Sequence, residues 1–474
     1  MVSMTSPPKH LPAAPTGQHG LLNPAWAGTA AASMTSDAAV VAALLEVEAA
    51  WGEVLAEAEL APAQSADALR ELSRDEAAHP DPAVLAEAAT GGGNPVIPLL
   101  AELRRLLAER GISDAALHRG ATSQDVLDTA LMLVVRRVID QVVTDLLRTG
   151  EALSRLADAH RETLAVARSL TQPAMPTVFG LRAAQWLEAL TDAAESLHAA
   201  AGAAPLQWGG AVGTQAALVE LAGSPARAEV LTARLAETLG LALPAMPWHT
   251  RRRPVLQAAT AAAEALAALG TLASDVLTLQ RPEIGELREP TAPGRGGSSA
   301  MPQKQNPVLS VLIRSAALAG PGHLATLHQA AGAAVDERPD GAWHAEWPAL
   351  TELLRLTGGA AARAAELCEG LQVFPAAMRQ NLDTAGPGVL GERLLARLGE
   401  AHPGGPAGLK ALLAEAGHGD IDLTARLRQE LPAETISDDE LTETLDPHRY
   451  VGRSAQLIDA AQARFGELRA GLAP

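Results

Sequence analysis

The spacing of apolar residues along the chain predicts a fold built of helices. In residues 36–60, apolar side chains recur every three or four positions behind Ser36, which suits a helix N-cap. A similar pattern predicts a long helix over residues 123–155. Residues 258–279 are mostly alanine and other apolar residues, and they predict a helix that is buried on nearly every face. Strand-forming residues are sparse over long spans, so we expect an all-α protein.

Breaks in this helical pattern divide the chain into domains. Residues 1–20 combine Pro, Ser, Thr and Gly, and we expect them to form a flexible N-terminal tail. We expect an N-terminal helical domain over residues 21–115, a central helix-bundle domain over residues 116–360 and a C-terminal helical domain over residues 361–474. A chain of 474 residues is long enough for this three-domain arrangement.

Composition and charge argue against a nucleic-acid partner, disulfide bonds and a membrane location. The formal net charge is −18 and the chain has no run rich in Lys and Arg, which argues against a nucleic-acid partner. The single cysteine, Cys368, excludes an intramolecular disulfide and suits the reducing cytoplasm. We expect no signal peptide and no membrane span, because the longest apolar stretch, residues 258–279, carries Glu264 and Asp275.

Residues 296–307, Gly-Gly-Ser-Ser-Ala-Met-Pro-Gln-Lys-Gln-Asn-Pro, carry the densest chemistry in the chain. The glycine-rich run before the two serines has little backbone preference, so we expect a mobile loop. A loop that closes over a substrate and presents a hydroxyl, an ammonium and a carboxamide suits proton abstraction next to a carboxylate. A plain Gly/Ser connection between two helices has the same composition, so composition alone leaves both interpretations open.

The order of residues in this loop resembles the signature loop of the fumarase/aspartase superfamily, whose members form or break a bond beside a carboxylate. Four other segments resemble motifs of its 3-carboxy-cis,cis-muconate cycloisomerase branch: residues 118–125, 167–180, 207–214 and 247–254. The resemblance covers nearly the whole chain. It implies a long central helix bundle that assembles into a homotetramer, with each site built from loops of three subunits. It also implies a small dicarboxylate substrate and no metal or other cofactor.

The resemblance assigns roles to individual residues. Ser298 matches the catalytic base, and Lys304 and Asn306 match the groups that stabilise the doubly charged aci-carboxylate formed by proton removal. A serine is a poor base unless backbone N–H groups stabilise its anion, which a closed glycine-rich loop could do. Arg252 is expected to clamp a substrate carboxylate through two parallel hydrogen bonds. The full set of expected substrate-binding residues is Asn94, Thr122, Ser123, Arg168, Gln172, Thr214, His249, Arg252, Ser299 and Met301.

One departure from the family pattern affects the chemistry. Fumarase-like members carry a histidine at the position of Leu170, and the cycloisomerase branch carries one at the position of Pro173. The residue that usually acts as the general acid is therefore missing. It stays open whether His249 or His344 replaces it.

Three functions are compatible with these residues. The favoured one is β-elimination from a succinate derivative with an anionic leaving group, such as nitrosuccinate to fumarate and nitrite, because nitrosuccinate lyases are relatives of this branch. General acid catalysis raises the reaction rate by ~10²–10⁴-fold when the leaving group is poor, and by little when it is nitrite. The second is a 3-carboxy-cis,cis-muconate cycloisomerase. The third, a non-catalytic crystallin-like protein, does not explain why Ser298, Lys304 and Asn306 are present.

Overall fold

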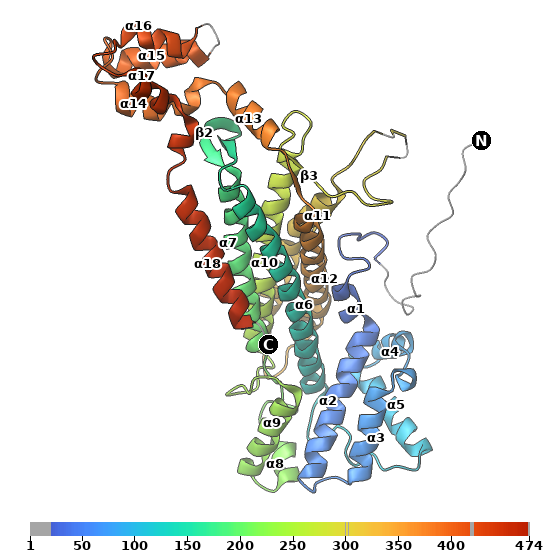
Figure 1. Ribbon diagram of the computed structural model, residues 1–474. Coiled ribbons are helices and arrows are strands. Elements are labelled where there is room, and N and C mark those ends of the chain that lie inside the picture. Colours follow the sequence, from blue (N-terminus) through green and yellow to red (C-terminus); the bar gives the residue numbers. More distant parts are fainter. Residues whose placement is uncertain (1–19, 299, 302, 418–420, 473–474) are drawn as a thin grey trace, which may run out of the picture. The chain divides into compact units, whose positions relative to one another are not determined.

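The computed structural model describes residues 20–298, 300–301, 303–417 and 421–472. Among these residues the chain forms helices and four short strands, which confirms the all-α fold (Figure 1). Contacts divide the chain into two compact units. Unit 1 holds the described residues up to Val142 together with Ser196–Glu264 and Ala319–Gly359. Unit 2 holds Val143–Glu195, Ala265–Leu318 and the described residues from Ala360 onward. Because the units interleave along the chain, the three consecutive domains stay a prediction.

Unit 1 contains the short helices of the first hundred residues and two from the middle of the chain. These are α1 (Ala30–Met34), α2 (Asp37–Glu57), α3 (Ala63–Arg74), η1 (Glu76–Ala78), α4 (Pro82–Ala89), α5 (Val96–Glu109), α8 (Ala216–Ala222) and α9 (Pro225–Leu239). The hydroxyl of Ser36 accepts a hydrogen bond from the backbone N–H of Ala39 at 3.2 Å. The N-cap and the helix expected over residues 36–60 are therefore confirmed.

Five long helices contribute residues to both units. They are α6 (Ser123–Ala159), α7 (Phe179–Gly202), α10 (Arg253–Leu279), α11 (Val308–Gly332) and α12 (Gly341–Glu369). Helices α6 and α10 confirm the two helices expected over residues 123–155 and 258–279. Helices α10 and α11 approach closely within unit 2, where a Cβ added to Gly270 would lie 2.6 Å from the Cβ of Ala317.

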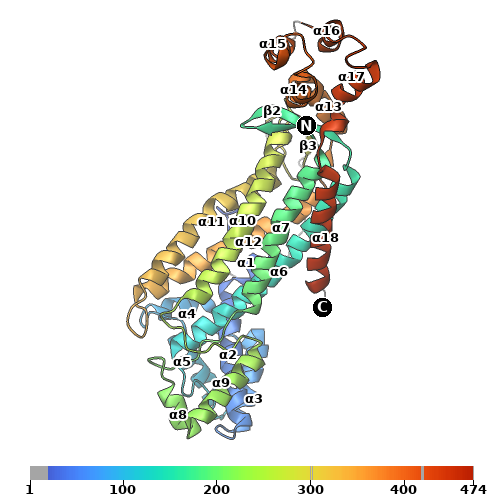
Figure 2. The same ribbon diagram turned by 90° about the vertical axis from the view of Figure 1, so that its left-hand side faces the viewer.

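Unit 2 contains the strands and the remaining helices. These are β1 (Leu164–Ser169), β2 (Gln172–Val178), β3 (Leu287–Arg288), β4 (Gln372–Val373), α13 (Pro375–Thr384), η2 (Pro387–Leu390), α14 (Gly391–Leu398), α15 (Gly405–Gly417), α16 (Leu423–Glu430), α17 (Asp438–Leu445), η3 (Pro447–Tyr450) and α18 (Ser454–Leu472). The short helices α14 to α17 gather at one end of this unit, near β2 (Figures 1 and 2). Helix α18 packs along α6 and α7, where Arg464 pairs with Glu188 at 2.5 Å and with Glu195 at 2.8 Å.

Strands β1 and β2 form an antiparallel hairpin that the sequence pattern did not predict. Its turn consists of Leu170 and Thr171, both with positive φ angles, 50° and 73°. Such a turn matches the twist of the hairpin but is strained for residues with a β-carbon. The side chain of Leu170 is 94% exposed. Prolines at positions 173 and 176 are tolerated because each strand of a two-stranded ribbon has one unpaired edge.

Helices α10 and α11 are long and apolar enough to cross a membrane by length and composition. Core helices of soluble proteins meet the same criteria, so this does not establish a membrane span. The two helices differ in burial: 56% of the most apolar stretch of α10 is buried inside the chain, but only 28% of that of α11. Helix α11 therefore carries exposed apolar side chains, including Val311 at 49% and Leu318 at 73%.

The contact between α6 and α18 generates a stability prediction. A Cβ added to Gly150 in α6 would lie 2.3 Å from the ring of Phe465, whereas one added to Gly466 in α18 meets nothing within 4 Å. We expect Gly150→Ala to lower the free energy of unfolding by ~1–3 kcal/mol, because the buried ring must move. Gly466→Ala is the matched control and should raise it by ~0.5–1 kcal/mol through helix propensity. Urea unfolding measures both, and equal stability of the two variants would contradict this packing.

Candidate active site

The first turn of α6 carries a buried carboxylate that joins three loops of unit 1. Asp125 is fully buried. Its donors are the backbone N–H groups of Thr122 (3.0 Å), Gly209 (2.7 Å) and Gly210 (2.9 Å), together with Gln207 Nε2 (3.2 Å) and His249 Nε2 (2.9 Å). These donors satisfy both oxygens of the buried charge. Asp125 thereby fixes the segments that carry the expected residues Thr122, Thr214 and His249.

A cation that sequence reasoning missed lies at the start of α6. Arg338 donates from Nη1 to the hydroxyl of Thr122 at 2.9 Å and from Nε to Gln124 Oε1 at 3.2 Å. Ser123 is the first residue of the helix, whose opening N–H groups have no intrahelical partner. A guanidinium, two hydroxyls and a helix N-terminus together suit a carboxylate. Its sequence signal is the charged segment Asp336-Glu337-Arg338, which lies downstream of the loop of residues 296–307.

The two histidines considered as replacement acids differ in their partners. His249 is 3% exposed, and its Nδ1 atom is buried without a hydrogen-bond partner among the described residues. Since Asp125 accepts from Nε2, Nδ1 is the free ring nitrogen. In His344 both ring nitrogens face backbone carbonyls, Gly93 O at 2.7 Å and Asp340 O at 3.1 Å. Of the two, only His249 has a ring nitrogen left for another group.

Arg252 does not have the surroundings expected of a substrate clamp. It is 3% exposed, and its guanidinium pairs with Asp128 at 2.7 Å and with Glu346 at 2.7 Å. Asp128 also accepts from Trp343 Nε1 at 2.9 Å. All three guanidinium nitrogens donate to protein oxygens. The expectation that Arg252 binds a substrate carboxylate therefore disagrees with the structure, in which it holds a buried ion cluster together.

The charges in this cluster are not balanced one to one. Burial disfavours the charged form of Arg252, but Asp128 and Glu346 outweigh burial, and the pKa of Arg252 is raised. Burial raises the pKa of Glu346, and the nearby charge of Asp128 adds to that effect, while hydrogen bonding to Arg252 opposes it. One guanidinium thus serves two carboxylates. It has no spare attraction for a substrate anion.

Asn94 and Thr214 lie on turns in unit 1. Asn94 is 7% exposed, and its side-chain oxygen accepts from the backbone N–H of Val96 at 3.1 Å. This bond satisfies the first N–H group of helix α5, whose N-cap residue is Pro95. Thr214 is exposed at the end of the turn that Asp125 holds. An added Cβ on Gly209 in the same turn would lie 2.8 Å from His249, so only glycine fits there.

In unit 2, the expected base lies under two backbone donors. Ser298 Oγ accepts from Met301 N at 3.2 Å and more weakly from Ala300 N at 3.4 Å. These N–H groups would stabilise a negative charge on the oxygen. Met301 is 44% exposed. Ser299, the other serine of the pair, lies outside the described residues.

The loop is closed at its base by Asn306. Its backbone N–H and its Nδ2 both donate to Gly296 O, at 2.8 Å and 3.1 Å. Gly296 has a φ of +72°, and an added Cβ would lie 2.6 Å from Asn306 O, so this closure requires glycine. The side chain of Lys304 is exposed, and its ammonium has no hydrogen-bond or ion-pair partner among the described residues. Its ammonium is therefore available to a substrate.

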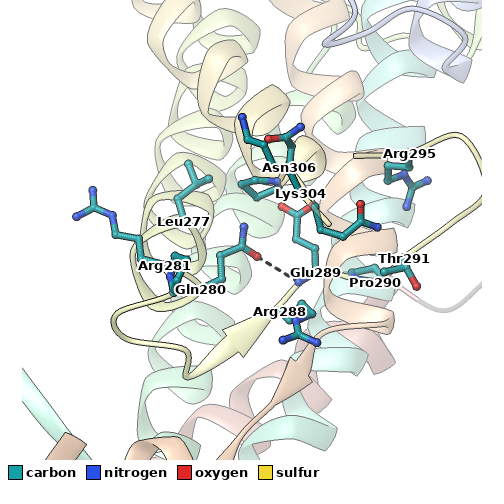
Figure 3. Close-up of a pocket in the computed structure, with 13 residues that line it drawn as sticks. Leu277, Gln280, Arg281, Arg288, Glu289, Pro290, Thr291, Arg295, Lys304 and Asn306 are labelled. Carbon is teal, nitrogen blue, oxygen red and sulfur yellow. Dashed lines mark hydrogen bonds between the residues drawn. The ribbon is translucent and has the colours of Figure 1, made fainter. Parts of the chain in front are cut away.

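A cavity of 370 Å³ lies beside the base of this loop within unit 2 (Figure 3). Glu289 is one of the residues that line it and is 6% exposed. Its carboxylate accepts from Leu309 N at 3.0 Å and Ser310 N at 2.7 Å, and so caps helix α11. Lys304 and Asn306 line the cavity on one side. The structure therefore brings these two expected residues together around an open space.

Arg168 and Gln172, the expected site residues on the β1–β2 hairpin, do not line this cavity and have other partners. Arg168 donates to both oxygens of Glu286, at 2.6 Å and 3.3 Å, and Asn381 donates to the same carboxylate at 2.7 Å. Gln172 is exposed, and its Nε2 donates to the hydroxyl of Thr171 at 3.1 Å. Arg168 thus anchors the hairpin inside unit 2. Across the described residues, no group of three or more His, Cys, Asp or Glu side chains could hold a metal ion.

Comparison with known proteins identifies the family. A family model described as a lyase matches residues 22–320. The chain belongs to the fumarase/aspartase superfamily of lyases. A nitrosuccinate lyase from Streptomyces davaonensis is 44% identical over 450 residues, covering 93% of this chain and 94% of that protein.

Other relatives of this lyase act as cycloisomerases. A 3-carboxy-cis,cis-muconate cycloisomerase from Bradyrhizobium diazoefficiens is 37% identical over 452 residues, covering 93% of this chain and 96% of that protein. The crystal structure of the 3-carboxy-cis,cis-muconate lactonizing enzyme from Pseudomonas putida has a TM-score of 0.86 at 34% identity, covering 95% of this chain and 100% of that chain. The recognition of this branch from its motifs is confirmed.

The ion cluster of this lyase generates a prediction that separates structure from substrate binding. Arg252→Met leaves Asp128 and Glu346 buried without their cation, so we expect the free energy of unfolding to fall by roughly 3–5 kcal/mol. Arg253→Met, at the exposed neighbouring position, is the control and should change stability by less than about 0.5 kcal/mol. Urea unfolding and steady-state kinetics on the same samples measure the effect. A raised KM with unchanged stability would restore the clamp role to Arg252.

Proposed function

We propose that this lyase catalyses β-elimination from 2-nitrosuccinate to give fumarate and nitrite. The observation that carries the proposal is the hairpin of β1 and β2, where Leu170 in the turn and Pro173 in β2 offer no proton to a leaving group. Nitrite needs none, because it is a stable anion in neutral water. A relative at 44% identity is a nitrosuccinate lyase, which supports the same reaction.

The reaction begins with proton abstraction alpha to a carboxylate. Ser298, as the alkoxide under its two backbone donors, takes the proton from the carbon next to the one that bears the nitro group. The C–H electrons then form the carbon–carbon double bond, and the C–N bond breaks with its electron pair leaving on nitrite. Lys304 and Asn306 stabilise the aci-carboxylate that forms between these steps. The products are fumarate and nitrite, and the proton remains on Ser298.

The second carboxylate of the substrate binds at the start of α6. Thr122, Ser123 and Arg338 supply the hydroxyls and the cation, so Arg338 takes the role first expected of Arg252. A planar guanidinium next to a helix N-terminus suits a carboxylate better than either feature alone. The other substrate-binding residues expected from the resemblance remain predictions. They are Asn94, Arg168, Gln172, Thr214, His249, Ser299 and Met301.

We further propose a homotetramer in the cytoplasm whose sites combine residues from different copies. The exposed apolar side chains of α11, such as Val311 and Leu318, support this assembly, because a second copy would remove them from water. The base of unit 2 and the carboxylate site of unit 1 would then reach one substrate from different copies.

A second candidate function is 3-carboxy-cis,cis-muconate cycloisomerase. Two findings favour it: relatives with that name, and the Nδ1 atom of His249, which has no partner among the described residues and would deliver a proton to carbon during lactone formation once the ring is an imidazolium. The two candidates differ in whether a proton donor is needed.

The substrate assay tests these two functions against each other. The purified protein should convert 2-nitrosuccinate to fumarate and nitrite in equal amounts, and succinyl compounds with amine leaving groups should react poorly. The pH profile of kcat/KM should show a limb for the base and none for an essential acid in the neutral range. Absorbance of fumarate and colorimetric nitrite measure the products. Efficient lactone formation from 3-carboxy-cis,cis-muconate without nitrite release would refute the lyase proposal.

Mixing two variants of low activity tests the shared site. Ser298→Ala should lower turnover by roughly 10²–10⁴, as expected for a lost general base, and Thr122→Val should weaken carboxylate binding without burying a charge. Tetramers reassembled from both variants should regain part of the activity, since some sites then contain both native residues. Ser298→Ala mixed with itself is the control. Light scattering that gives a monomer of 48.9 kDa would contradict the shared site.

A further inference from the structure

A buried carboxylate joins the two ends of the segment that carries the proposed base. Glu289 directly follows β3 and is 6% exposed. Its two oxygens accept from Leu309 N at 3.0 Å and from Ser310 N at 2.7 Å, both in the first turn of α11. The chain between Glu289 and Leu309 includes Ser298. The hydrogen bonds of Glu289 therefore hold the strand before the loop against the helix that follows it.

Helix α11 depends on this carboxylate because it has no cap of its own. The first N–H groups of a helix lack partners within the helix. Pro307, immediately before α11, has neither an N–H group nor a side-chain acceptor. Val308 N donates to Asn306 O at 3.0 Å, and the next two N–H groups donate to Glu289. A carboxylate suits this place because a helix N-terminus carries partial positive charge.

The backbone of Glu289 is fixed as well as its side chain. Its N–H donates to Gln280 Oε1 at 3.2 Å, and Gln280 directly follows α10 (Figure 3). Strand β3, which ends just before Glu289, pairs with β4. One residue thus ties the end of α10, a strand and the start of α11 together. The two ends of the loop are held together while these bonds persist.

The constraint continues from α11 to the groups proposed to react. Asn306 lies just before α11 and closes on Gly296 O through its backbone N–H at 2.8 Å and its Nδ2 at 3.1 Å. Gly296 in turn lies just before Ser298. Backbone N–H groups use both oxygens of Glu289, so the bonds that hold the loop leave the ammonium of Lys304 unneutralised.

We propose that Glu289 is a positioning residue for the elimination and acts through the start of α11 and Asn306. The inference rests on the proposed function, in which Ser298, Lys304 and Asn306 take part in the reaction. A displacement of about 1 Å in a reacting group costs about 10²-fold in rate. Glu289 fixes the loop that carries these groups and has no contact with the carboxylate site at the start of α6. It therefore governs kcat more than substrate binding.

The test compares wild type with Glu289→Gln and two controls. Glutamine has the same shape, but its amide keeps one acceptor oxygen and turns a donor towards the second N–H group. Asp422→Asn makes the same chemical change at the start of α16, where Asp422 accepts from Ala425 N at 3.1 Å. Gly150→Ala controls for a general loss of stability, because an added Cβ there meets the ring of Phe465.

Cleavage by a lysine-specific endoprotease reports on the loop without any substrate. The lysines of the chain are Lys9, Lys304 and Lys410, so Lys304 reports on the loop and Lys410, in α15, is the internal reference. Cleavage of a folded chain follows the population of its locally open state. In Glu289→Gln, the ratio of cleavage after Lys304 to that after Lys410 should rise by about tenfold or more, as expected when hydrogen bonds to a charged group are lost. Both controls should keep the wild-type ratio.

Steady-state kinetics on 2-nitrosuccinate is the second readout. Glu289→Gln should lower kcat by about 10²-fold and change KM much less, whereas both controls should match wild type where all variants are folded. A wild-type cleavage ratio in Glu289→Gln, or a loss confined to KM, would overturn the proposal. Faster cleavage after Lys304, with no turnover of 2-nitrosuccinate by wild type, would refute the elimination and still support the role of Glu289 in holding the loop.

A second variant keeps the proposal testable if Glu289→Gln does not fold. Gln280→Met removes the acceptor of the Glu289 N–H and leaves the carboxylate in place. The cleavage ratio should then rise and kcat should fall, each by a smaller factor than expected for Glu289→Gln. Wild-type values of both quantities in Gln280→Met would overturn the proposal.

Discussion

The buried carboxylate of Asp125 is the interaction on which the candidate site of unit 1 depends. A charge taken out of water is costly unless donors replace the lost hydration. Here the donors come from the start of α6, from the turn at residues 207–210 and from His249, so the carboxylate is stable only when all three segments are in place. Because the buried charge requires all of these donors, it fixes the three segments relative to one another. Thr122 and Thr214 lie on those segments, so the hydrogen bonds to Asp125 also determine where these two residues lie.

Some cations in this protein are buried in ion pairs that hold the structure together, and others contact solvent and are available to a substrate. Arg252 is buried in ion pairs with Asp128 and Glu346, so its charge is neutralised within the protein. Arg338 and Lys304 keep contact with solvent, and each retains donors that a substrate could use. The proposed elimination has an anionic substrate and anionic products. It therefore needs cations that are not already neutralised by the protein. The same distinction applies to the acids, because both oxygens of Glu289 accept hydrogen bonds from the start of helix α11.

Unit 2 places the proposed base and the groups proposed to stabilise the aci-carboxylate on a short closed loop instead of on a helix. Gly296 and Asn306 join the ends of the loop, and the backbone inside it donates to Ser298. Donors fixed before the reaction lose no energy to reorganisation when charge develops, which is the advantage of such a loop for a weak base. The hairpin adds a turn strained at Leu170 and Thr171. Strain of this kind persists only where the surrounding structure fixes it.

The sequence by itself determined the fold class, the main helices and the superfamily. Helical periodicity is a local property, which is why α2, α6 and α10 could be placed from spacing alone. The order of residues in the loop from Gly296 to Pro307 is likewise readable without any structure.

Only the tertiary structure decided which residues face which. Three adjacent arginines lie at the start of α10, and the sequence could not say that Arg252 points into an ion cluster while Arg251 and Arg253 are exposed. Arg338 reaches Thr122 across 216 positions of sequence, and the cavity wall combines residues from 277 to 307 that meet through β3 and the ends of α10 and α11. The physical reason is the same in each case. Side chains distant in sequence become neighbours only through packing, and whether a charge is free or neutralised depends on those neighbours.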